Sequence, residues 1–130
     1  MRKGIKSIVA IAAMAGMIGG AGAAMAKVGD VIERGSCSGS SDWKLKLSPE
    51  DGRIEVEFEV DSNKVGQTWH VRLTDNGTKV FGGSRVTQGS SGSFTVRKVT
   101  TDLAGTDHVK GHAMNSATGE TCAGAASFAA

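Results

Sequence analysis

The chain has 130 residues, with 15 Lys and Arg against 13 Asp and Glu, two cysteines, one proline and no tyrosine. A chain of this length forms one domain, because it is too short for two independent hydrophobic cores. The small formal charge of +2 excludes a strongly basic nucleic-acid binder.

The first 26 residues predict a signal peptide. Three of the first six residues are basic, residues 8–18 are apolar, and Ala24-Met25-Ala26 matches a cleavage site. Cleavage there leaves residues 27–130, with 12 basic and 13 acidic side chains and a formal charge of −1. The alternative is an uncleaved anchor, because residues 7–26 are uncharged and about 20 such residues span a bilayer. We expect a secreted, extracellular protein that has no membrane contact after cleavage.

Apolar and polar residues alternate with period two through most of residues 31–122, which predicts strands. In chain order we expect strands at residues 31–37, 42–47, 54–60, 69–74, 78–84, around 94–96, at 109–113, and a short last one that carries Cys122. Seven to eight short strands without a helical pattern predict an all-β fold, an antiparallel two-sheet sandwich. A short flexible tail should follow at the C-terminus.

The cysteines, Cys37 and Cys122, are 85 positions apart and flank this strand region. Disulfides persist in exported proteins, so we expect a disulfide between them. The alternatives are metal ligation and a catalytic thiol, since residues 35–39 match a G-x-C-x-G pattern. That nucleophile turn requires a strand-to-helix connection in a large α/β sheet, which this chain is too short to form.

Two hairpins are expected, each with a specific register. Across the turn at residues 48–52, Leu47 should face Ile54, and Lys46 should face Glu55. Apolar residues then meet on one face and opposite charges on the other.

Asn76-Gly77 predicts the second hairpin, in which Leu73 should face Val80 and Arg72 should face Phe81. Phe81 would then be exposed beside Arg72, and these two residues form a candidate contact site. For Phe81, ordinary packing or a β-bulge is the preferred interpretation over such a contact site.

The remaining aromatic residues indicate a core rather than a sugar-binding surface. Trp43 and Trp69 are in phase with the apolar residues of their strands. Phe128, in the expected tail, is out of that phase.

Two stretches carry a family resemblance. Residues 102–109 (DLAGTDHV), followed by 118–122 (TGETC), resemble the last strands of bacterial immunoglobulin-like domains. Residues 36–41 (SCSGSS) and 43–52 (WKLKLSPEDG) are similar to small secreted proteins of high-GC Gram-positive bacteria that have no assigned activity. The resemblance implies an immunoglobulin-like sandwich, although the disulfide joins the first and last strands and the corner tyrosine of antibody domains is missing. Function does not follow from such a fold.

A metal site is considered on the strand that carries His108, His112 and Met114, because imidazole and thioether groups bind copper. On a strand, however, residues four positions apart are separated by about 13 Å, which is too far for one ion. Solvated histidines on a polar face are the alternative.

The motifs do not indicate catalysis. Serines cluster at residues 36–41 and 90–93, but these are Gly-rich turns and no G-x-S-x-G motif occurs. Glu55, Glu57 and Glu59 face lysines on the expected sheet and form a charge-paired surface. We therefore expect a noncatalytic secreted module without a cofactor, which binds an extracellular protein or a cell-envelope component and not nucleic acid. The alternatives are a copper or small-ligand carrier that uses His108, His112 and Met114, and a protease inhibitor that presents residues 82–92.

Overall fold

A computed structural model describes residues 28–129. The predicted signal peptide, residues 1–26, lies outside the described residues, and its cleavage stays a prediction. Within residues 28–129, no helix is long and apolar enough to cross a membrane.

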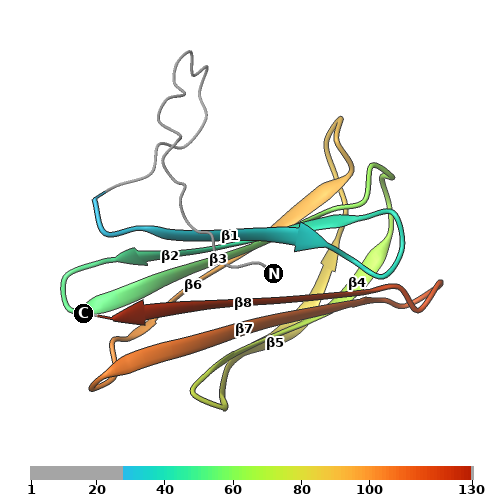
Figure 1. The fold of residues 1–130 in the computed structure, drawn as a ribbon. Helices are drawn as coiled ribbons and strands as arrows, with labels where there is room; N and C mark the ends of the chain where they lie inside the picture. Colours follow the sequence, from blue (N-terminus) through green and yellow to red (C-terminus); the bar gives the residue numbers. More distant parts are fainter. Residues whose placement is uncertain (1–27, 130) are drawn as a thin grey trace.

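The described residues form eight antiparallel strands in two four-stranded sheets (Figure 1). The strands are β1 (Val31–Ser36), β2 (Asp42–Pro49), β3 (Arg53–Asp61), β4 (Thr68–Asp75), β5 (Thr78–Val86), β6 (Ser93–Thr101), β7 (Thr106–Asn115) and β8 (Thr121–Ala129). The first sheet has the order β1-β2-β3-β6, and the second has the order β5-β4-β7-β8. The predicted all-β two-sheet sandwich is confirmed.

The connectivity from β2 onward can be compared with that of immunoglobulin domains. In those domains strands A, B, E and D form one sheet, and strands C, F and G, with C′ added in variable-type domains, form the other. Here β2, β3 and β6 occupy the A, B and E positions, while β5, β4, β7 and β8 occupy C′, C, F and G. Strand β1 extends the first sheet beyond A, and the described residues contain no D strand. The two sheets close on each other where β1 and β2 lie beside β8 and where β5 lies beside β6.

The core lies between the sheets and is built from every second residue of the inner strands. Trp69 on β4 and Phe58 on β3 are its largest fully buried side chains. Around them pack the aliphatic residues of both sheets, among them Leu45, Leu47, Ile54, Val56, Leu73, Val96 and Val109. Trp43 is partly buried and packs against this cluster, so both tryptophans contribute to the core as predicted.

The first hairpin has the predicted faces but a register two residues away from the prediction. Leu47 pairs with Val56, and Lys46 pairs with Glu57. The turn is shorter than expected, because Asp51 and Gly52 both have positive φ, 52° and 76°. Two left-handed residues form a two-residue type I′ connection, so Ser48 and Pro49 remain in β2 and shift the pairing.

The second hairpin turns at Asn76-Gly77 as predicted, with φ values of 50° and 85°. Its register is also offset, because a β-bulge between Leu73 and Thr74 leaves Leu73 opposite Phe81. The bulge places Phe81 on the inner side of β5, where it is half-buried against the core. Ordinary packing or a bulge, the interpretation preferred for Phe81, is therefore confirmed, and Phe81 is not an exposed contact residue.

The C-terminal residues form a strand rather than a tail. Strand β8 continues to Ala129, and Phe128 is 7% exposed within the core. Phe128 is therefore in the core phase of a longer last strand than the sequence predicted.

Two glycines allow the Trp43 ring to sit between the edges of the sheets. A Cβ atom at Gly35 of β1, or at Gly124 of β8, would lie 2.7 Å from a ring carbon of Trp43. We expect Gly124→Ala to destabilise the fold by about 1–3 kcal/mol through overpacking. Thermal denaturation monitored by circular dichroism measures this effect. Ala125→Ser is the control, since residue 125 is exposed on the same strand and its replacement should leave the melting temperature unchanged.

Candidate functional site

The outward surface of the second sheet is the strongest candidate for a binding site. Inward residues of β4 and β7 alternate with exposed ones, so the exposed side chains share the outer face. Lys79 of β5 joins them, because its side chain lies next to Gly82 on this side. We call this surface the basic face and define it by His70, Arg72, Lys79, His108, Lys110 and His112.

The basic face carries no opposing charge. The acidic residues within the four strands, Asp75 and Asp107, are both buried. No ion pair within the described residues involves Arg72, Lys79 or Lys110. The positive charges are therefore available to a partner.

The first sheet has a different outer surface, on which opposite charges are paired. Lys44 lies 3.7 Å from Glu59, and Arg97 lies 3.4 Å from Glu57 and also contacts Glu55. The predicted charge-paired face is confirmed, although the partners differ because of the shifted register. On the outer face of the second sheet, by contrast, the exposed basic side chains have no exposed acid among them.

Hydrogen bonds from neighbouring strands orient two histidine rings of the basic face. His70 Nδ1 lies 3.0 Å from Ser84 Oγ on β5, and His108 Nδ1 lies 2.9 Å from Ser127 Oγ on β8. In both rings this leaves Nε2 for an external ligand.

The proposed metal residues are only partly brought together. His108 and His112 lie on the same face of β7 but four positions apart, about 13 Å by the rise of a strand. The pairing of β4 with β7 instead places His70 directly opposite Met114. The sequence prediction did not include His70, and the only clue to it was its outward phase on the strand of Trp69.

Arg72 and Phe81 do not form a joint contact site. Arg72 faces Gly82 and lies on the basic face, whereas Phe81 faces Leu73 on the inner side. The Arg85 guanidinium stands 5.0 Å from the centre of the Phe81 ring, a cation–π contact that covers it. Arg72 therefore keeps a place in the candidate site and Phe81 does not.

The segment considered as an inhibitory loop is mostly held by the fold. Residues 82–86 belong to β5, and Thr87 is fully buried. Thr87 Oγ1 donates to the Lys64 carbonyl oxygen at 2.5 Å and accepts from the Gln67 amide at 2.9 Å. Residues 88–92 form a short turn, and its end is also held, because the Gly92 carbonyl oxygen accepts from Ser62 Oγ at 3.1 Å. This turn is a short surface for a protease.

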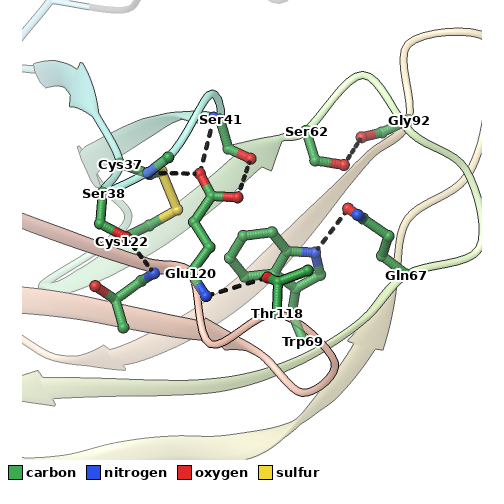
Figure 2. The surroundings of a disulfide bond; sticks show 12 residues. Cys37, Ser38, Ser41, Ser62, Gln67, Trp69, Gly92, Thr118, Glu120 and Cys122 are labelled. Atoms are coloured by element: carbon green, nitrogen blue, oxygen red, sulfur yellow. Dashed lines mark hydrogen bonds between the residues drawn. A yellow bond between two sulfur atoms is a disulfide. The ribbon is translucent and has the colours of Figure 1, made fainter.

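A pocket of about 400 Å³ opens beside the disulfide, whose bond between Cys37 and Cys122 is present as predicted (Figure 2). Both cysteines of the chain are therefore oxidised, and neither supplies a thiol nucleophile. The lining residues include four serines but no histidine; they are Ser38, Gly39, Ser40, Ser41, Ser62, Lys64, Gln67, Thr118, Gly119 and Glu120.

The acidic residue of this pocket, Glu120, accepts hydrogen bonds from a neighbouring turn. Glu120 Oε2 accepts hydrogen bonds from the amides of Gly39 and Ser41 at 3.0 and 2.9 Å, and Oε1 accepts from Ser41 Oγ at 3.0 Å (Figure 2). These bonds hold the turn between β1 and β2 against the turn between β7 and β8. With three donors around it, this carboxylate serves as a structural hydrogen-bond acceptor.

Three carboxyl groups meet on the inner side of the second sheet. Asp75 of β4 and Asp107 of β7 are 2% and 0% exposed, and Asp102 lies in the loop before β7. Neither oxygen of Asp75 receives a hydrogen bond, while Asp107 Oδ2 accepts one from the Leu103 amide at 3.2 Å. From the sequence, Asp102 and Asp107 are expected to be turn residues. Asp75 and Asp107 are in phase with Leu73 and Val109, and that phase is the clue to their burial.

These carboxyl groups favour a bound proton. Burial is the main cause that raises the pKa of Asp75 to about 7, and the neighbouring carboxyl groups of Asp107 and Asp102 add to it. Burial and Asp107 likewise raise the pKa of Asp102. Carboxyl groups placed close together in a buried site disfavour the charged form, so Asp75 favours a bound proton below its raised pKa. In residues 28–129, no three His, Cys, Asp or Glu side chains are arranged to hold a metal ion.

Comparison of the chain with protein-family models, with curated proteins and with solved structures gives no match. The resemblance to bacterial immunoglobulin-like proteins therefore stays a prediction from the sequence motifs. The function has to be argued from the surface of the molecule itself.

Proposed function

We propose that the protein is a noncatalytic secreted module that binds an anionic polymer of the cell envelope through the basic face. The observation that carries the proposal is the concentration of Lys, Arg and His on the outer face of the second sheet without an exposed acid. Residues 27–130 have a formal charge of −1, so this positive surface arises from segregation and not from an excess of basic residues.

The shape of the basic face fits a polymer better than a small ligand. The pocket at the disulfide end shares no lining residue with this face. Side chains on neighbouring strands are spaced regularly, so several of them can contact successive charges of an extended chain. Secretion is supported by the signal-peptide pattern and by the disulfide, which is typical of oxidising compartments.

A pair of charge-matched variants tests the proposal with dextran sulfate as the probe and uncharged dextran as its control. Arg72→Gln combined with Lys110→Gln removes two charges from the basic face. Arg34→Gln combined with Arg53→Gln removes two exposed charges from the first sheet. Exposed charge contacts contribute up to about 1 kcal/mol each, so the first variant should weaken binding about tenfold and the second should leave it nearly unchanged. Isothermal titration calorimetry at two salt concentrations measures both affinities.

An equal loss of affinity for dextran sulfate in the two double variants would show that only the overall charge matters. It would contradict binding through the basic face. Binding of uncharged dextran with the same affinity would contradict the anionic partner.

A further inference from the structure

The pairing of β4 with β7 assembles three metal-binding side chains from different parts of the sequence. His70 lies opposite Met114, and Arg72 lies opposite His112, so His70 and His112 are diagonal neighbours. Opposite residues have Cβ atoms about 4.5–5.5 Å apart, and diagonal ones are about 7–8 Å apart. His112 and Met114 stand two positions apart on the same exposed face. At these Cβ separations, the two imidazoles and the thioether can converge on one metal ion above the sheet.

The contact between His70 and Ser84 prepares one ligand. The Ser84 hydroxyl lies 3.0 Å from Nδ1 of the ring, so the other ring nitrogen, Nε2, is left for a metal ion. Histidine ligands in metal sites commonly have their second nitrogen held by a hydrogen bond of this kind.

The donor set and the surrounding charge select the ion. A thioether with imidazoles is a soft donor set that suits copper(I), whereas calcium and magnesium require oxygen ligands. Arg72 and Lys110 flank His112, and the exposed positions of the second sheet include no carboxylate. Their positive charges repel a divalent ion about twice as strongly as a monovalent one. We infer that His70, His112 and Met114 form a binding site for a monovalent soft metal ion, copper(I).

His108 is not part of this site and provides an internal control. It shares the exposed face of β7, but it lies about 13 Å from His112 by the rise of a strand. Its Nδ1 is held by Ser127 in the same way as His70 is held by Ser84. His108→Ala therefore removes a comparable imidazole without removing a ligand.

The experiment titrates the protein with silver(I), a redox-inert analogue of copper(I), in chloride-free buffer while methionine methyl and histidine ring signals are followed by NMR. In the wild-type protein the Met114 methyl and the ring signals of His70 and His112 should shift together and saturate at one ion. His70→Ala, His112→Ala and Met114→Leu should each weaken binding at least about tenfold, whereas His108→Ala should leave it unchanged. The titration uses residues 27–130, in which Met114 is the only methionine, so its methyl signal is unambiguous.

Zinc(II) is the second probe. It should bind the wild-type protein more weakly than silver(I), and Arg72→Gln should raise its affinity several-fold by removing the repelling charge. A Met114 methyl signal that does not move in the wild-type protein would overturn the inference without any variant. The inference would also be overturned if His108→Ala lost as much silver(I) affinity as the ligand variants do. Tighter binding of zinc(II) than of silver(I) would overturn it as well. The inference does not rest on polymer binding by the basic face.

Discussion

Replacing both cysteines by alanine should lower the melting temperature by about 20 °C while the strand content stays native. The bond between Cys37 and Cys122 closes a loop of 85 residues. In the chain-entropy model a loop of this length contributes roughly 4–5 kcal/mol by restricting the unfolded chain. A domain of about 100 residues loses about 4 °C of melting temperature per kcal/mol. Alanine is preferred to serine because Cys122 is fully buried, and a serine would place a hydroxyl group in the core.

Thermal denaturation of the oxidised wild type and the double variant measures the effect, and far-ultraviolet circular dichroism reports the strand content. The reduced wild type is the matched control. It has lost the same covalent link, so its melting temperature should fall to that of the double variant. A double variant that melts at the temperature of the oxidised wild type would contradict the structural role of the bond.

Asp75→Asn should stabilise the protein, and the gain should grow with pH. The pKa of Asp75 is about 7 in the folded protein, against an ordinary value of 3.8 for this carboxyl group, chiefly because the side chain is buried. Between these two values the folded protein binds more protons than the unfolded chain, so stability falls as the pH rises and levels off above the folded pKa. The full shift corresponds to about 4 kcal/mol. We expect about half of this free energy, because the effective dielectric constant around a buried charge is higher than that of a dry protein interior.

Melting temperatures of the wild type and Asp75→Asn at pH 4, 6 and 8 measure the difference. The two proteins should be nearly equal at pH 4, and the variant should melt about 8 °C higher at pH 8. Asp42→Asn, at an exposed position of β2, is the control and should show a difference that does not grow with pH. A variant that is less stable than the wild type at pH 8 would show that the charged form of Asp75 stabilises the fold.

The strands were predictable because apolar and polar residues alternate along each of them. Alternation placed Leu45, Leu47, Val56 and Phe58 on the inner face, and the structure buries all four. The disulfide followed from an even number of cysteines at the two ends of the strand region. The register was less accessible, since the left-handed pair Asp51-Gly52 and the bulge after Leu73 each moved a hairpin by one or two positions.

By itself, the sequence determined the fold class, the inward residues of most strands, the disulfide and the lack of a catalytic motif. These depend on period-two alternation and on composition, which are local properties of the chain. Only the tertiary structure decided which residues meet: His70 with Met114, Asp75 with Asp107, and Trp43 with Gly35 and Gly124. The physical reason is that β4 pairs with β7 and β1 lies beside β8. Contacts between strands so far apart in sequence depend on the packing of the whole sandwich, and no local pattern records them.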